Sequence, residues 1–231
     1  MKDVEHIFFD LDHTLWDFDR NSSETLAELF ESYKLGDEIE SSETFIAKYQ
    51  EINNQFWKLY REGKIEKAKL RYIRFMQTFE IFGLKKDQKF AEQFAADYLE
   101  VCPHKTNVFP GTFETLEHLA GKYPLHIITN GFKEVQGIKM EKSGLGKYFD
   151  LILSSEDVGV NKPDPRVFNR ALELTNASHN NSVMIGDTYE ADIVGAENVG
   201  MKAILFNPSK ANIEAKTNQI YHLTELIDIF A

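Results

Sequence analysis

Short apolar runs alternate with amphipathic stretches along most of the chain. Five of these runs have the length of a strand, and each is flanked by polar or turn-forming residues: 4–9, 125–129, 151–154, 183–186 and 203–206. Because the runs are apolar throughout, we expect strands that are covered on both faces. The pattern therefore predicts an α/β fold, with a parallel sheet and helices on either side of it.

The segment between the first two predicted strands has a different pattern. From about residue 21 to residue 101, apolar residues recur at helical spacing, which predicts four helices. Such helices can be plain packing elements, but these directly follow the first strand, and ligands bind at the carboxyl ends of parallel strands. We therefore expect a helical lid domain at 18–103 and a core domain formed by 1–17 and 104–231.

The charge balance restricts the partners. The 231 residues include 37 acids against 26 lysines and arginines, a net charge of −11, which repels nucleic acid polymers and anionic membranes. A small anion can still be bound by local donors and a metal. The single cysteine, Cys102, excludes an intramolecular disulfide and fits a reducing compartment, where we expect it to be buried filler. Because the chain shows no signal peptide and no apolar run of membrane-spanning length, we expect a cytoplasmic protein.

Two acids, Asp10 and Asp12, follow the first predicted strand. Residues two apart in an extended strand point to the same side, so these carboxylates should converge. Two like charges at such close range are costly unless a cation lies between them or one of them holds a proton. The pair therefore indicates a metal site, a proton carrier, or both.

Four polar clusters follow separate predicted strands. They span residues 10–14, 129–131, 161–165 and 186–192. Each cluster alone can be a turn, because Asp, Asn, Gly and Pro are the ordinary turn residues. All four, in this order at the carboxyl ends of parallel strands, indicate a single site.

The order of the clusters is DxDxT, a strand ending in Thr, Lys followed by Pro, and GDxxxxD. This order resembles the haloacid dehalogenase (HAD) superfamily, most of whose members are Mg2+-dependent phosphohydrolases. The resemblance covers essentially the whole chain and implies a Rossmann-like core with a C1 helical cap inserted after the first strand. The segments DLDHTLWDFD, 63–75 and VFPG are further similar to the house-cleaning pyrimidine 5′-nucleotidase branch of that superfamily.

Phosphoryl transfer needs a nucleophile in line, charge compensation, and a proton for the leaving oxygen. Asp10, at the tip of the strand, suits the nucleophile and would form an aspartyl-phosphate. Asp12 suits the general acid that protonates the leaving oxygen and then the base that activates water. This division of roles requires Asp12 to hold a proton more readily than Asp10.

The acids also suit a metal ion. Mg2+ prefers oxygen ligands in octahedral geometry, so we expect it to be held by the Asp10 carboxylate, the Asp12 backbone carbonyl, Asp187 and the substrate phosphate. Asp192, about one helical turn beyond Asp187, is better placed outside the ligand shell. The family pattern agrees with both assignments.

The phosphate needs further donors. Lys162 supplies a permanent positive charge for the phosphate and Asp10. The hydroxyl of Thr129 and the backbone amides of Asn130 and Gly131 would donate hydrogen bonds to phosphate oxygens. In the HAD superfamily, the Thr or Ser at the position of Thr129 has this role.

Several other side chains allow two interpretations. Trp16 and Phe18 either stack on a nucleobase or belong to the core, and the core is the commoner role. His13 either touches the substrate or has a solvent-facing or capping role. Arg71 and Arg74 either meet an anionic or carbonyl group or lie on a solvated helix face, and the solvated face is the commoner role.

The sequence thus predicts a Mg2+-dependent phosphomonoester hydrolase acting on a small phosphorylated substrate, a nucleoside 5′-monophosphate. The alternatives are a phosphatase for sugar phosphates or other small phosphomonoesters, a phosphomutase, and a non-catalytic binding module. Haloalkanoate dehalogenases use the same nucleophile without a metal, but their residue at the position of Asp12 is not acidic. Since an acid is useful for protonating an alkoxide and unnecessary for releasing halide, Asp12 favours phosphate esters. We expect a monomer or a weak homodimer.

Overall fold

The computed structural model describes residues 1, 3–213 and 218–231. The chain divides into two compact units. One unit consists of Met1–Phe18 and Thr106–Ala231 and contains the sheet, and the other, Asp19–Lys105, is helical. Among the described residues, none of the helices combines the length and the apolar character needed to cross a membrane.

The sheet has six strands in the order β3-β2-β1-β4-β5-β6, and all neighbouring pairs are parallel. The strands are β1 (His6–Phe9), β2 (Leu125–Thr129), β3 (Leu151–Ser154), β4 (Ser182–Gly186), β5 (Lys202–Phe206) and β6 (Asn218–Ile220). The first five confirm the predicted strands and the predicted parallel α/β fold. The sequence analysis missed β6, because its three residues, Asn-Gln-Ile, form no apolar run.

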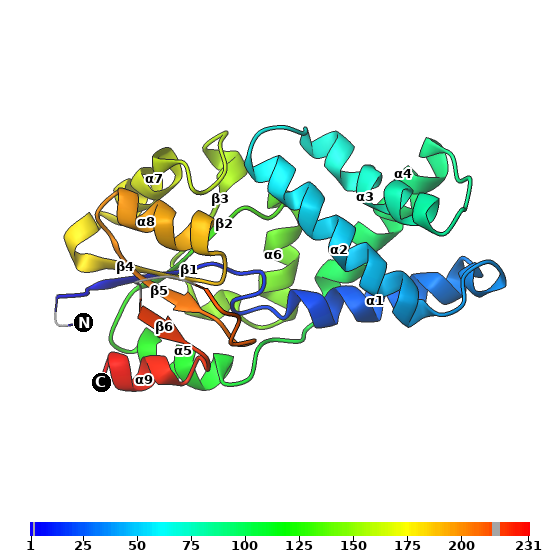
Figure 1. Cartoon of the computed structure of the whole chain (residues 1–231). Coiled ribbons are helices and arrows are strands. Elements are labelled where there is room, and N and C mark those ends of the chain that lie inside the picture. The colour runs from blue at the N-terminus through cyan, green and yellow to red at the C-terminus, as the bar shows by residue number, and fades with distance from the viewer. Residues whose placement is uncertain (2, 214–217) are drawn as a thin grey trace. The chain divides into compact units, whose positions relative to one another are not determined.

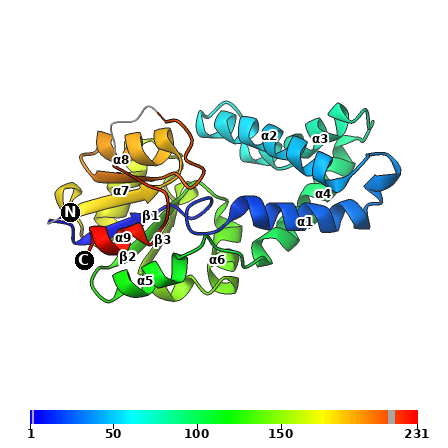
Figure 2. The same ribbon diagram turned by 60° about the horizontal axis from the view of Figure 1, so that its bottom comes forward.

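Helices cover both faces of the sheet, as Figures 1 and 2 show. On one face lie α7 (Pro165–Thr175) and α8 (Gly195–Asn198), and on the other lie α5 (Thr112–Ala120) and α9 (Glu225–Ile229). A further helix, α6 (Lys133–Lys142), follows β2 in the chain. Phe8, Ile128 and Met184 of the sheet pack with Phe168 of α7 in one buried core. Burial on both sides explains why the strands are mainly apolar.

The register of the central strands brings their carboxyl ends to the same level. Phe9 at the end of β1 pairs with Ile127 of β2 and Ile185 of β4. The polar residues that follow these strands therefore emerge at one edge of the sheet, the edge at which α/β proteins bind ligands.

The helical unit contains α1 (Phe18–Ser32), α2 (Ser42–Arg61), α3 (Lys67–Ile81) and α4 (Gln88–Val101), with α1 beginning one residue before it. These are the four predicted helices. Side-chain caps begin two of them, because Ser41 accepts a hydrogen bond from the backbone of Thr44 and Asp87 from that of Phe90. The core of the unit is rich in aromatic rings: Phe45, Tyr49, Phe75, Phe79, Phe94 and Tyr98. Cys102 is buried, as predicted.

Arg74 corrects one expectation. The sequence analysis favours a solvated helix face for Arg74, but its side chain is almost fully buried. Its Nη1 donates to Asn53 Oδ1 at 2.8 Å, and its guanidinium lies 5.1–5.8 Å from the ring centroids of Tyr49, Phe75 and Tyr98. Aromatic faces stabilise a desolvated guanidinium, and these rings come from three helices, so burial here depends on tertiary packing.

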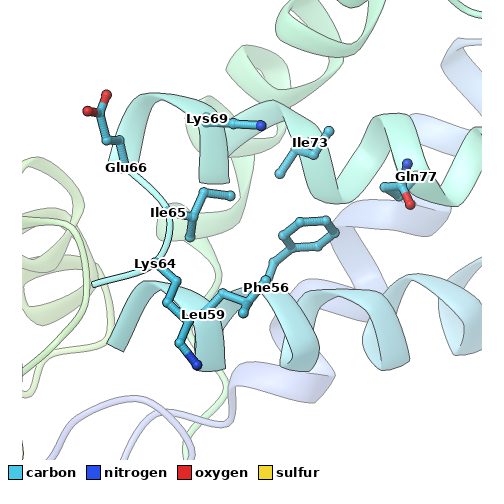
Figure 3. Close-up of a pocket in the computed structure, with 8 residues that line it drawn as sticks. All are labelled: Phe56, Leu59, Lys64, Ile65, Glu66, Lys69, Ile73 and Gln77. Carbon is cyan, nitrogen blue, oxygen red and sulfur yellow. The ribbon is translucent and has the colours of Figure 1, made fainter. Parts of the chain in front are cut away.

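A groove of about 490 Å³ lies in the helical unit between α2 and α3 (Figure 3). Phe56, Ile65 and Ile73 point toward one another there, whereas Glu66 points away. The other lining residues are Leu59, Lys64, Lys69 and Gln77. None of the predicted site residues lines this groove.

His126 of β2 makes the stability of the fold depend on pH. It is buried against Phe8, its Nε2 lies 3.2 Å from His6 Nδ1, and its own Nδ1 has no partner among the described residues. Burial, reinforced by His6, lowers the pKa of His126 from 6.5 to about 4. Between pH 6.5 and about pH 4, His126 therefore binds a proton in the unfolded chain but not in the folded chain. The free energy of unfolding falls as the pH falls through this range.

We expect the wild type to lose about 1–2 kcal/mol more stability than His126→Gln between pH 7 and pH 5. Urea unfolding at both pH values measures this difference. The matched control is His222→Gln, at an exposed histidine, which should behave like the wild type. Equal pH dependence of the wild type and His126→Gln would contradict the prediction.

Candidate active site

Lys162 joins two of the predicted acids. Its Nζ lies 2.8 Å from Asp10 Oδ1 and 2.6 Å from Asp192 Oδ1, and it donates to the backbone oxygen of Ile128 at 2.6 Å. All three ammonium hydrogens thus have acceptors. Although burial opposes the charge, the carboxylates of Asp10 and Asp192 raise the pKa of Lys162 above its ordinary value. Lys162 is therefore a permanent cation at this edge of the sheet.

Asn130 fixes the backbone of Lys162. Its side-chain oxygen accepts a hydrogen bond from the Lys162 amide at 2.8 Å, and its side-chain nitrogen donates to the Lys162 carbonyl at 3.0 Å. The sequence analysis considers only the backbone amide of Asn130. The Asn130 side chain links the second polar cluster to the third, and it fixes the backbone from which the Lys162 side chain extends.

Three carboxylates lie close together. Asp10, Asp187 and Asp192 each offer an oxygen within 4.8 Å of the others. Burial, together with the neighbouring acids, raises the pKa of Asp10 well above its ordinary value, and burial raises the pKa of Asp187. Thr14 Oγ1 donates to Asp187 Oδ1 at 3.0 Å. Buried, mutually repelling carboxylate oxygens are a donor set that suits a hard divalent cation such as Mg2+.

Asp192 differs from the other two acids. Its Oδ1 accepts from Lys162, and its Oδ2 accepts from the backbone amide of Thr188 at 3.0 Å. It lies in a π-helical turn, Tyr189–Val194, a rare geometry that is frequent at functional sites. A Cβ on Gly186 would lie 2.4 Å from the Asp192 carboxyl carbon, so glycine is required there. Since both of its oxygens have donors, Asp192 fits the outer position expected for it.

Asp12 lies against a different helix. Its Oδ1 is 2.6 Å from Lys139 Nζ, and its Oδ2 accepts from Gln136 Nε2 at 3.3 Å. The sequence analysis requires Asp12 to hold a proton more readily than Asp10. That requirement stays a prediction, and the structure adds the contacts of Asp12 with an ammonium and an amide of α6.

The second polar cluster makes internal hydrogen bonds. The backbone amide of Gly131 donates to Thr129 Oγ1 at 3.0 Å, so in this structure one expected phosphate donor is used by its neighbour. The backbone approaches these side chains closely at Gly131, since a Cβ there would lie 1.6 Å from Gln136 Nε2 and 3.0 Å from Asp12 Oδ2. The geometry thus places the second cluster directly beside Asp12.

Sequence analysis missed Gln136 and Lys139. Both lie on α6 and are buried. They are three residues apart, on one face of the helix that follows the second cluster. Two polar residues on the buried face of a helix next to a candidate site are the signal that could have identified them.

Trp16 belongs to the core. Its side chain is fully buried, and the Lys139 ammonium lies 4.3 Å from its ring centroid. Of the two interpretations of Trp16, the core role is therefore the one that the structure supports. Phe18 is half-buried and lies 4.8 Å from the ring of His13.

Comparison with known proteins gives the family. A model of the haloacid dehalogenase-like hydrolases matches residues 7–206. The pyrimidine 5′-nucleotidase YjjG of Escherichia coli (strain K12) is 35% identical, over 87% of this chain and 85% of that protein. The pyrimidine 5′-nucleotidase PynA of Streptococcus pneumoniae is 31% identical, over 96% of this chain and 93% of that protein. The crystal structure of the HAD-hydrolase YfnB from Bacillus subtilis bound to magnesium has a TM-score of 0.87 and 29% identity, over 98% of each chain. The chain is an enzyme of the haloacid dehalogenase-like hydrolase family.

Proposed function

We propose that the enzyme is a Mg2+-dependent phosphomonoester hydrolase that acts through an aspartyl-phosphate on Asp10. The observation that carries this proposal is the cluster of Asp10, Asp187 and Asp192, of which Asp10 and Asp192 pair with the buried ammonium of Lys162. Phosphoryl transfer to a carboxylate requires a nucleophilic carboxylate, a fixed cation and a further set of oxygen ligands.

The chain's own residues divide the chemistry between them. The Asp10 carboxylate attacks phosphorus while the ester oxygen leaves and takes a proton from Asp12. Asp12 then removes a proton from water, which attacks phosphorus and frees phosphate and Asp10. Lys162 holds Asp10 in place and offsets the charge of the phosphoryl oxygens.

The remaining predicted residues bind the phosphate and the metal. Thr129, with the amides of Asn130 and Gly131, would donate to phosphate oxygens once the Gly131 amide turns from Thr129 to the ligand. The Asp10 carboxylate, the Asp12 backbone carbonyl and Asp187 would hold Mg2+, which when bound offsets the negative charge of the substrate and the carboxylates.

We further propose that the substrates are nucleoside 5′-monophosphates and that the helical domain is a lid that selects them. Two relatives that are 35% and 31% identical over most of the chain are pyrimidine 5′-nucleotidases, which supports this choice. A small phosphorylated substrate also agrees with the acidic net charge. The buried thiol of Cys102, which forms no disulfide in the structure, is consistent with the reducing cytoplasm that we propose as the location.

A screen for released phosphate tests the substrate class. With Mg2+ present, we expect pyrimidine nucleoside 5′-monophosphates to exceed sugar phosphates in kcat/KM by about tenfold or more. A preference for sugar phosphates would contradict the nucleotidase proposal and leave a phosphatase. Transfer of the phosphoryl group to another position, without release of phosphate, would indicate a phosphomutase. If every ester stayed intact, a binding module would be favoured.

Metal removal tests the cofactor. Charge stabilisation by a metal contributes several kcal/mol, so chelation should lower kcat by about 100-fold or more, and added Mg2+ should restore it. The control is circular dichroism of the chelated protein, which should retain the signal of the folded enzyme. Full activity in excess chelator would rule out a metal-dependent site.

A further inference from the structure

Lys139 is a buried lysine for which the proposed chemistry has no role. Its side chain is 5% exposed and that of Asp12 19%, with 2.6 Å between Lys139 Nζ and Asp12 Oδ1. Exposed ion pairs do little to fix geometry, whereas buried pairs are costly to form and are known in some proteins to fix a specific arrangement. The cost of desolvating Lys139 therefore suggests that the position of Asp12 matters.

The ammonium of Lys139 also lies over two aromatic rings. It lies 4.3 Å from the ring centroid of Trp16 and 5.6 Å from that of Phe18. Trp16 belongs to the same turn as Asp12, because its carbonyl accepts from the His13 amide at 3.0 Å. Cation–π contact strengthens as the cation is desolvated. Lys139 thus contacts both the carboxylate and the rings of one chain segment, which restricts its movement.

The two oxygens of Asp12 have different environments. Oδ1 faces an ammonium, which can only donate, so this oxygen remains an acceptor. Oδ2 faces the amide of Gln136, whose Nε2 donates to it and whose Oε1 is buried without a partner among the described residues. Rotation of that amide would turn an acceptor toward Oδ2. Oδ2 is therefore the oxygen of Asp12 that no cation holds.

We propose that Lys139 is a positioning residue that fixes Asp12 through Oδ1, so that proton transfer to the leaving oxygen takes place from Oδ2. This inference rests on the proposed phosphatase function and deepens it. In the step concerned, the Asp10–phosphorus bond forms, the bond from phosphorus to the ester oxygen breaks, and the Asp12 proton moves to that oxygen. Lys139 contacts Oδ1 of Asp12 and neither Oδ2 nor the leaving ester oxygen, so it acts through Asp12.

Leaving-group dependence tests this role. An alkoxide needs a proton as it leaves, whereas p-nitrophenolate does not, and kcat/KM reports the steps up to alcohol release. We expect Lys139→Met to lower kcat/KM by about 100-fold for a nucleoside 5′-monophosphate and by less than about threefold for p-nitrophenyl phosphate. If Lys139→Met does not fold, Lys139→Gln serves in its place. In an Asp12→Asn background, the Lys139 substitution should cause no further selective loss.

The matched control is Lys133→Met, on the same helix, where the lysine is 63% exposed and pairs with Asp157. It should leave both substrates unchanged. Equal losses on both substrates after Lys139→Met would overturn the positioning role, because a structural lysine or a direct phosphate ligand acts on every ester alike. An inactive wild type would instead overturn the proposed function, and the positioning role with it.

Discussion

Asp10→Asn should lower kcat for phosphate release by about 10⁴-fold or more, since loss of a nucleophile removes the covalent route and not merely a binding contact. The amide has nearly the same shape as the carboxylate, so the sheet should remain intact. Asp10 lies 2.8 Å from Lys162, so the variant keeps an oxygen for that ammonium. Steady-state phosphate release and circular dichroism measure both outcomes.

The matched control for Asp10→Asn is Asp3→Asn, at an acid whose side chain is 87% exposed and lies 3.8 Å from Lys202 Nζ. This variant should retain the wild-type kcat. The nucleophile assignment would be refuted by an Asp10→Asn enzyme that is folded and turns over at the wild-type rate. A loss that appears in both variants would show that the effect is not specific to Asp10.

Lys162→Met should destabilise the fold as well as abolish turnover. Removing the cation leaves Asp10 and Asp192 buried without their shared partner. Breaking a buried ion pair in this way costs about 3–5 kcal/mol. Urea unfolding at pH 7.5 measures this loss. By contrast, Lys133→Met removes an exposed ion pair and should leave the urea midpoint nearly unchanged.

The loss in Lys162→Met should also depend on pH. Burial already raises the pKa of Asp10 in the wild type, and loss of the ammonium would raise it further. A raised carboxyl pKa means that the folded state binds more protons than the unfolded state above the ordinary carboxyl pKa, so stability is lost as pH rises through the folded pKa. We therefore expect the deficit relative to the wild type to shrink from pH 7.5 to pH 5. A deficit that stays constant, or that is below about 1 kcal/mol at pH 7.5, would contradict the account.

The sequence was sufficient for much of the fold because the signals concerned were local. Five strands are mainly apolar without alternation, which is typical of a sheet covered on both faces. The helical insert has a clear helical period. The strand at 218–220 has a single apolar residue and no such signal. Its place at the sheet edge depends on pairing with β5, which is a tertiary contact.

The same distinction applies to the site. Asp10, Lys162 and Asp187 follow strands whose order could be predicted, so their convergence followed from parallel topology. Lys139 and Arg74 could not be placed in this way, because the burial of a long cationic side chain depends on which rings and acceptors other helices bring to it. The ammonium partner of Asp12 was missed for the same reason, since it comes from α6.

The central claim is that Asp10 carries the phosphoryl group during turnover. The most direct measurement is to quench the enzyme with acid during turnover with substrate and Mg2+, reduce acyl phosphates with borohydride, and locate the reduced residue by peptide mass spectrometry. The account predicts reduction at Asp10 that depends on substrate and is absent in Asp10→Asn. An unmodified Asp10, or modification at another residue, in an enzyme captured while releasing phosphate at its full rate would contradict it.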